Sequence, residues 1–157
     1  RRDPLARVCR LDRLLIAALV QTLGAYLRGT EREEIPTLRM LGLDADQIGR
    51  RASKVKRRVG SVDRAAGRLV SVVDGVSKTG GGSSPSGERP TRLLAVELPG
   101  SDAGRLEREL RLGDPPIIGR VQEGRLLLDL RTVLPEQDEP LAQRLAGVLA
   151  EKAVGPR

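Results

Sequence analysis

The first apolar pattern along the chain has helical spacing. Between residues 12 and 28, leucine, alanine and Tyr26 recur three or four positions apart, and Gly29 follows as a stop signal. This pattern predicts a long, largely buried helix. The preceding residues 4–10 are expected to form an initial turn or a separate short helix, because a proline at a helix start loses no N–H group that the helix needs.

A second helix is predicted after a short helical turn that ends at Gly42. Asp44 stands three residues before Gln47, the spacing of a capping box at a helix start. Gly60 is expected to end this helix. Its apolar residues form one stripe at steps of four, three and four, namely Ile48, Ala52, Val55 and Val59. Basic residues occupy most of the remaining surface, namely Arg50, Arg51, Lys54, Lys56, Arg57 and Arg58.

The pattern changes to β-strand character after residue 66. Residues 67–75, "GRLVSVVDG", are rich in β-branched residues and bounded by glycines, and residues 92–98, "RLLAVEL", are a second candidate strand. The Gly- and Ser-rich residues 77–91 between them have the composition of a flexible connection. Residues 101–113 then predict a helix with Ser101 or Asp102 at its cap.

Two further strands and a last helix complete the pattern. "IIGRVQ" and "RLLLDLRTV" flank Glu123 and Gly124, a tight hairpin signal, and residues 139–153 present apolar positions at helical spacing. The order is helices first, then β, β, α, β, β, α. The sequence therefore predicts an α+β fold in which helices cover one face of a small, mainly antiparallel sheet.

Composition removes several kinds of chemistry. The chain has no histidine and one cysteine, Cys9, which excludes histidine acid–base catalysis, His/Cys metal sites and an internal disulfide. Tyr26 is the sole aromatic residue, so platforms for stacking bases are absent. The longest apolar run, residues 14–20, is too short to span a bilayer. A cytoplasmic, membrane-free setting is expected.

The net charge of +7 is concentrated in the first half of the chain. Residues 1–78 carry 17 basic and 9 acidic side chains, whereas residues 79–157 carry 11 and 12. This asymmetry favours a polyanionic partner or substrate near the first half. For the basic helix around residues 50–58, binding of a nucleic-acid backbone and a merely solvated outer face both stay open.

Other candidate sites carry weaker signals. Arg7 and Arg10 are three residues apart and, with Arg13, form either a row that binds an oxyanion or a solvated row of arginines. The glycines at residues 80–82 lack the ending of a P-loop, and Lys78 is expected to be exposed. No chemistry is assigned to four carboxylates, because they show no acid–base pairing, namely Asp129, Glu136, Asp138 and Glu139.

Five collinear segments carry a family resemblance. They are "DPLARVCRLDR", "LIAALVQTLGAYL", "IPTLRML", "SKTGGGSSPSGERPT" and "GDPPIIGRVQEGRLLLDLRTVLPEQDE". Together they resemble the C-terminal part of bacterial selenocysteine synthase, L-seryl-tRNA(Sec) selenium transferase, a pyridoxal-phosphate enzyme of fold type I. The resemblance covers nearly the whole chain, and its last segment is long and specific.

The resemblance implies an incomplete enzyme. In the family, a large N-terminal region holds pyridoxal 5'-phosphate and the Schiff-base lysine, neither of which the resemblance places in this chain. Residues 1–30 are then a linker helix, and residues 31–157 are the small C-terminal domain. The chain alone is expected to have no catalytic residue and no activity, and the whole protein is expected to be a homo-oligomer that acts on seryl-tRNA(Sec).

The resemblance also gives Arg7 and Arg10 a role. They match the two arginines that the family uses to bind the selenium donor, selenophosphate, and guanidinium provides a planar fork suited to such an anion. Asp3 stands where the family often has histidine, and Arg13 replaces a common lysine. An acid near the anion site opposes donor binding, which leaves a divergent copy possible.

Two alternative functions stay open on the sequence alone. One is a noncatalytic basic module that binds RNA or protein. The other is a relative in the pyridoxal-phosphate superfamily that acts on a small amino acid. Within the leading hypothesis, the basic helix at residues 50–58 is a candidate contact for tRNA in the assembled oligomer.

Overall fold

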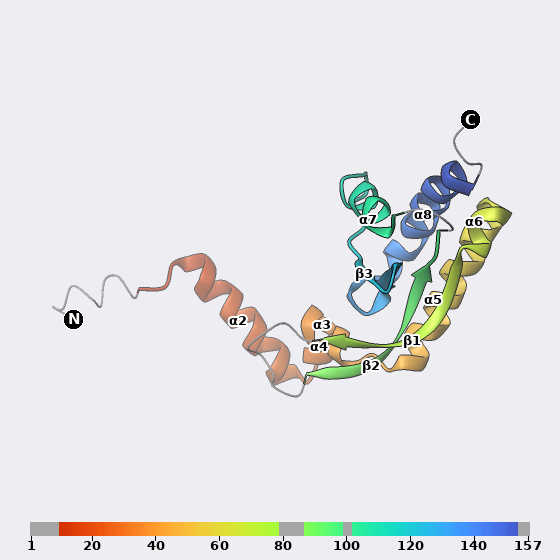
Figure 1. Ribbon diagram of the computed structural model, residues 1–157. Coiled ribbons are helices and arrows are strands. Elements are labelled where there is room, and N and C mark those ends of the chain that lie inside the picture. The colour runs from red at the N-terminus through yellow and green to blue at the C-terminus, as the bar shows by residue number, and fades with distance from the viewer. Residues whose placement is uncertain (1–9, 79–86, 99–101, 154–157) are drawn as a thin grey trace. The chain divides into compact units, whose positions relative to one another are not determined.

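The computed structural model describes residues 10–78, 87–98 and 102–153 of the 157-residue chain. The chain divides into two compact units, Arg1–Gly42 and Leu43–Arg157. Each unit has its own internal contacts, and its helices and strands are labelled in Figure 1.

Within its described residues, the first unit contains the helices α2 (Arg13–Arg28), α3 (Glu31–Glu34) and α4 (Pro36–Gly42). Asp12 caps α2 by accepting a hydrogen bond from the Leu15 N–H at 2.9 Å, and Gly29 ends it in the left-handed conformation at φ 71°. The predicted helix over residues 12–28 is therefore confirmed. Hydrogen bonds from Thr30 and Arg28 lower the pKa of Glu34. The ion pair between Arg28 and Glu34 also connects the end of α2 to α3.

The predicted burial of this first helix is wrong in the described chain. Within α2 only Ala25 is buried, while Leu14 is 82% and Leu27 90% exposed. Apolar residues occur at consecutive positions here, so they surround the helix on more than one side and need a cover that the described elements do not supply. The exposed apolar side chains are Leu14, Leu15, Ile16, Leu19, Val20, Leu23, Tyr26 and Leu27.

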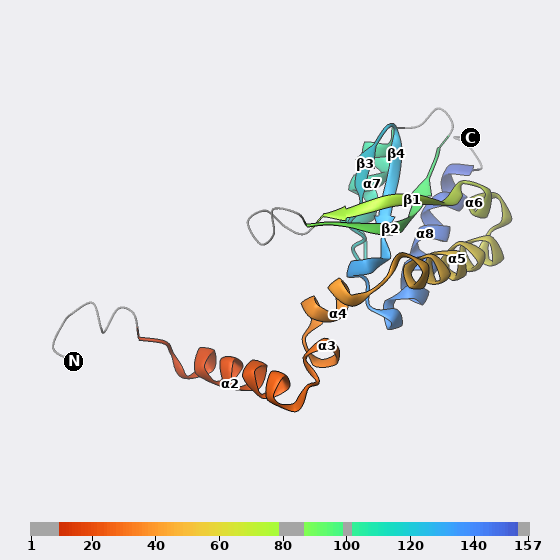
Figure 2. The same ribbon diagram turned by 90° about the horizontal axis from the view of Figure 1, so that it is seen from below.

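The second unit has the predicted α+β architecture. Its helices are α5 (Ala45–Val62), α6 (Arg64–Arg68), α7 (Ala103–Arg111) and α8 (Asp138–Ala153). Its strands are β1 (Val70–Lys78), β2 (Glu88–Val96), β3 (Arg120–Gln122) and β4 (Arg125–Asp129). The strands form one sheet in the order β1-β2-β4-β3, and every neighbouring pair is antiparallel (Figure 2).

The two faces of the sheet follow the alternation of side chains along its strands. Leu94 and Val96 of β2 face the helices and belong to the main core together with Leu126 and Leu128 of β4. The side chains between them, Leu93, Ala95 and Leu127, form a smaller buried cluster on the opposite face. Helices α5, α7 and α8 all contribute to the main core, so they cover one face of the sheet, as predicted.

Helix α5 is positioned by its two predicted signals. Asp44 accepts from the Gln47 N–H at 2.6 Å and the Gln47 side chain accepts from the Asp44 N–H at 3.1 Å, which confirms the capping box. The four residues of the stripe are fully buried, namely Ile48, Ala52, Val55 and Val59. Gly60 does not end the helix, which continues to Val62, and Asp63 then caps both the end of α5 and the start of α6.

Strand boundaries differ from the prediction where polar side chains cap short helices. Asp63 accepts from the Ala66 N–H at 2.6 Å and starts α6, so β1 begins at Val70 rather than at residue 67. Asp129 accepts from the Arg131 N–H at 3.0 Å and starts the 3-10 helix η1 (Leu130–Thr132), which shortens β4. A second 3-10 helix, η2 (Pro135–Gln137), leads into α8.

The predicted hairpin turn is confirmed and requires positive φ angles. Glu123 has φ 52° and Gly124 has φ 73°, and they join β3 to β4. Both angles lie in the left-handed region that two-residue hairpin turns use. Gly147 in α8 is a useful contrast, because a Cβ added there meets no atom within 4 Å.

We expect Gly124→Ala and Gly147→Ala to change stability in opposite directions. The first forces a Cβ into the left-handed region and should lower the free energy of unfolding by about 1–2 kcal/mol. The second replaces glycine in a helix interior and should raise it by about 0.5–1 kcal/mol. Urea denaturation measures both changes, and a stabilising Gly124→Ala would contradict the turn geometry.

Candidate functional site

The basic side chains of α5 fall into two groups according to what they contact. Arg51 and Arg58 form ion pairs with carboxylates at the start of α8. The other members form no ion pair with any residue that the structure describes, namely Arg50, Lys54, Lys56 and Arg57. The second group is therefore available to a ligand.

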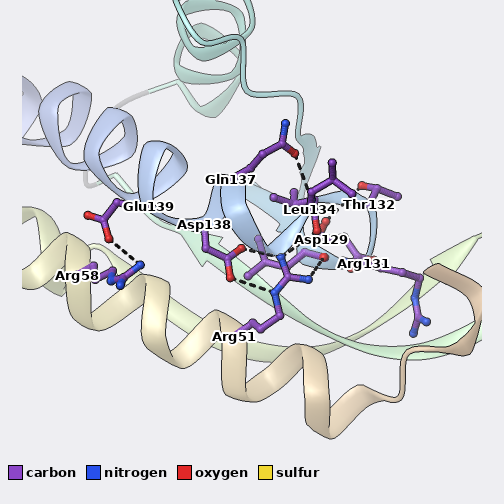
Figure 3. Close-up of polar contacts among 11 residues, drawn as sticks. Arg51, Arg58, Asp129, Arg131, Thr132, Leu134, Gln137, Asp138 and Glu139 are labelled. Carbon is purple, nitrogen blue, oxygen red and sulfur yellow. Dashed lines mark hydrogen bonds and ion pairs between the residues drawn. The ribbon is translucent and has the colours of Figure 1, made fainter. Parts of the chain in front are cut away.

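Arg51 is turned into the protein (Figure 3). Its Nε and Nη2 atoms donate to the two carboxylate oxygens of Asp138 at 3.0 and 2.6 Å. Nη1 and Nη2 also donate to the carbonyl oxygens of Leu130 at 3.0 Å and Val133 at 2.8 Å. The side chains of Arg51 and Asp138 are only 16% and 13% exposed, so the sequence interpretation that grouped Arg51 with a basic outer face is wrong.

Arg131 is a second buried guanidinium. It donates to the carbonyl oxygens of Leu43 at 2.6 Å and Pro90 at 2.8 Å, and to Ser77 Oγ at 2.9 Å. Burial lowers the pKa of Arg131 from its ordinary value and the nearby charge of Arg89 acts in the same direction, whereas the charges of Asp129 and Asp44 oppose the shift. Arg131 therefore ties the segment before α5 to strands β1 and β2.

The carboxylates singled out in the sequence have structural contacts. Asp129 accepts hydrogen bonds from Ser77 Oγ, from Thr91 Oγ1 at 3.1 Å and from the Arg131 N–H. Asp138 holds Arg51, and Glu139 pairs with Arg58 at 2.6 Å near the surface. Glu136 is exposed on η2. Asp129, Asp138 and Glu139 thus accept from hydroxyl, backbone N–H or guanidinium donors in the described part of the chain.

Two surface hollows border the available cations of α5. One has a volume of about 510 Å³ and the other about 700 Å³. Lys54 and Arg57 line both hollows, so these two side chains stand on the ridge between them. Arg50 lines the first hollow together with Ser53, Val72 and Arg92. We refer to Arg50, Lys54 and Arg57 as the α5 basic ridge.

Arg92 reaches the ridge because α5 has a glycine opposite it. A Cβ added to Gly49 would lie 2.9 Å from Arg92 Cγ, so the stem of Arg92 crosses the helix where a side chain is missing. The Arg92 guanidinium pairs with Asp74 at 2.6 Å. This arrangement brings a cation from β2 to the side of the first hollow.

The predicted oxyanion row lies partly outside the described residues. Arg7 lies there, as do Asp3, Cys9 and the glycines at residues 80–82. Arg10 is exposed and precedes α2, and Arg13 is the first residue of that helix. The pairing of Arg7 with Arg10 therefore stays a prediction. Lys78 is the last residue of β1 and is exposed, as predicted. Its Nζ atom lies 3.6 Å from Oε1 of Glu88.

The described residues lack two other kinds of site. They contain no cluster of three or more His, Cys, Asp or Glu side chains arranged to hold a metal ion. Within the same residues, no helix combines the length and apolar character that crossing a membrane requires.

Comparison with known proteins identifies the family. The chain matches the SelA family model, described as L-seryl-tRNA selenium transferase, over residues 1–134. It is 42% identical over 143 residues to the L-seryl-tRNA(Sec) selenium transferase of Geobacter sulfurreducens, which covers 89% of this chain and 30% of that relative. The enzymes of the same name from Geotalea daltonii and Aquifex aeolicus are 37% and 33% identical over 151 and 150 residues.

These matches show the family to which the chain belongs. It belongs to the L-seryl-tRNA selenium transferase family, which confirms the resemblance carried by the five sequence segments. The match to Geotalea daltonii covers 95% of this chain and 32% of the relative, and the match to Aquifex aeolicus covers 96% and 32%. The chain thus spans about a third of the length of the curated relatives it matches.

The lysines of this chain do not fit a Schiff-base site for pyridoxal phosphate. The sequence has four lysines, and Lys54, Lys56 and Lys78 are exposed at the surface. Lys152 on α8 pairs with Glu109 at 2.7 Å. A Schiff-base lysine needs a site that excludes water, whereas three of these side chains are exposed and the fourth is engaged in an ion pair.

We expect Arg51→Ala to lower the free energy of unfolding by about 2–3 kcal/mol, because it leaves Asp138 and two carbonyl oxygens without their donor. Arg58→Ala is the matched control. Its ion pair with Glu139 has both side chains about half exposed, and its loss should cost less than about 1 kcal/mol. Urea denaturation of both variants makes the comparison, and equal losses would contradict the difference between the buried Arg51 contacts and the half-exposed Arg58 ion pair.

Proposed function

We propose that this chain is the C-terminal part of a selenium transferase that uses pyridoxal phosphate to convert L-seryl-tRNA(Sec) to L-selenocysteinyl-tRNA(Sec), with selenophosphate as selenium donor. In the net reaction selenium replaces the seryl hydroxyl group. The observation that carries this proposal is the family match over residues 1–134, together with relatives named for this activity. The homo-oligomeric state and the cytoplasmic location expected from the sequence are part of the proposal.

The cofactor is assigned by this proposal to polypeptide beyond the chain. Two observations support the assignment. The chain spans about a third of its relatives, and none of its four lysines lies in surroundings that fit a Schiff base. By itself the chain is then inactive.

Helix α2 has a role in the same proposal. Its exposed apolar side chains include Leu14 and Leu27, and such surface is normally covered in a finished protein. We infer that the cofactor-binding part packs against α2, which makes residues 1–30 a linker between that part and the small domain of residues 31–157.

Arg7 and Arg10 are proposed to bind selenophosphate. Both match the family's arginine pair, and a guanidinium group binds phosphate oxygens through two parallel hydrogen bonds. The exposure of Arg10 leaves its side chain accessible to an anion. Arg105 on α7 is also exposed, belongs to the other unit and provides a control.

The activity is tested with the full-length protein that contains this chain. We expect it to transfer labelled selenium from selenophosphate to seryl-tRNA(Sec) in the presence of pyridoxal phosphate, and we expect the 157-residue chain alone to transfer none. Activity on free serine without tRNA would favour the alternative of a small amino-acid enzyme. Folded full-length protein that is inactive toward both substrates would favour the noncatalytic module.

The donor site is tested by Arg7→Lys with Arg10→Lys in the full-length protein. Lysine keeps the charge but loses the planar fork, so we expect kcat/KM for selenophosphate to fall about tenfold or more, mainly through a higher KM. The KM for seryl-tRNA(Sec) should change little. Arg105→Lys should leave both constants unchanged. An unaltered KM for selenophosphate in the double variant would refute the assignment.

A further inference from the structure

We propose that the α5 basic ridge, Arg50, Lys54 and Arg57, binds the phosphate backbone of the tRNA substrate. The identity of the RNA rests on the proposed function. The contact itself rests on the charge, exposure and placement of these three side chains.

The ridge differs from its neighbours in having no internal partner. All three side chains are exposed, and none forms an ion pair with a residue in the described part of the chain. Arg51 and Arg58 on the same helix are both paired with α8. The fold therefore uses two cations of α5 for itself and leaves the ridge with uncompensated positive charge.

The spacing of the ridge suits an extended polyanion. Its residues follow at steps of four and three, which places them on one side of the helix over about 10 Å of its length. Hollows of about 510 and 700 Å³ lie on the two sides of Lys54 and Arg57. The sugar–phosphate backbone of an RNA that crosses the ridge can thus approach the cations from either hollow.

The packing of α5 fixes which way the side chains of the ridge point. The stripe of α5 is fully buried, and Arg51 binds Asp138 and two carbonyl oxygens on the neighbouring segment. The helix therefore cannot turn about its axis without exposing apolar residues and breaking these hydrogen bonds. Cations held in a fixed direction bind an anion with less loss of conformational freedom.

Acidic groups near the ridge do not cancel its charge. Asp46 lines the first hollow, and so does Arg92, whose charge is neutralised by its ion pair with Asp74. The three ridge cations and Arg92 thus face two carboxylates, which leaves a net positive surface. Asp138 borders the second hollow but is already held by Arg51.

RNA fits this surface better than a lipid membrane does. A helix that binds in a membrane surface inserts its apolar face among the lipids, whereas the apolar stripe of α5 is fully buried in the core. The sequence has no aromatic side chain besides Tyr26, which lies in the other unit, so bases have nothing to stack on here. The contact is therefore with phosphates, and it adds affinity without reading the base sequence.

The experiment compares two double variants of the full-length protein. Lys54→Gln with Arg57→Gln removes two charges of the ridge. Arg105→Gln with Arg108→Gln removes two charges from α7, at the same three-residue spacing, from arginines that are also exposed and without an ion pair to described residues. The Kd for a tRNA(Sec) transcript is measured over a series of salt concentrations, and equal unfolding midpoints establish that both variants are folded.

We expect the ridge variant to bind the transcript about tenfold more weakly at about 0.1 M salt. Its log–log salt slope should decrease by about 2 in magnitude, one for each lost phosphate contact. The α7 variant should retain the affinity and slope of the unaltered protein. Equal effects of the two variants, or an unchanged slope in the ridge variant, would overturn the inference.

Two further measurements distinguish RNA from other polyanionic partners and distinguish this inference from the proposed function. Polyglutamate and phosphatidylserine-containing vesicles replace tRNA as polyanions, and a ridge-dependent binding of either one that exceeds the effect on tRNA would overturn the assignment to RNA. Transferase activity together with tRNA binding that is unchanged in the ridge variant would overturn this inference alone. A protein without transferase activity whose tRNA binding still depends on the ridge would refute the proposed function and support the contact.

Discussion

The guanidinium group of Arg51 holds together three parts of the second unit that are far apart in the sequence. It joins the middle of α5 to the carbonyl groups of Leu130 and Val133 after β4 and to Asp138 at the start of α8. With the buried stripe of α5, this set of hydrogen bonds determines which side of the helix meets the core. Every other charged position on α5 takes its direction from that constraint.

The basic side chains of α5 therefore have two different roles. Arg51 and Arg58 are seven residues apart, so they lie on the same flank of α5, the flank that meets α8. The desolvation of Arg51 is compensated by a carboxylate and two carbonyl oxygens. Lys54 and Arg57 stay in water, where an anion can reach them without first breaking an internal contact.

Local signals predicted the local structure well. The spacing of the α5 stripe, the Asp44–Gln47 capping box and the Glu123–Gly124 turn each involve residues close together in the sequence, and each is found in the structure. The order of helices and strands along the chain followed from the same signals, and so did the α+β class.

Long-range contacts were not predictable in the same way. The acceptors of Arg51 lie about 80 residues further along the chain, so the sequence around α5 does not show that this arginine is turned inward. Arg131 donates to Leu43 and Pro90, which lie 88 and 41 residues away in the sequence. The basic helix was thus recognised as a candidate site, but its free and occupied cations were separated only by the structure. The sequence pattern of α2 correctly indicated an apolar helix. It could not indicate which part of the protein packs against the apolar side chains.

Helix α2 also affects how this chain behaves in solution on its own. A run of leucine, isoleucine and valine side chains that stays in contact with water favours self-association, because joining two such surfaces releases ordered water. This driving force strengthens on warming from low temperature and in sulfate, and urea weakens it. Aggregation of the isolated chain would therefore originate in its first unit, while the well-packed sheet and helices of the second unit remain folded.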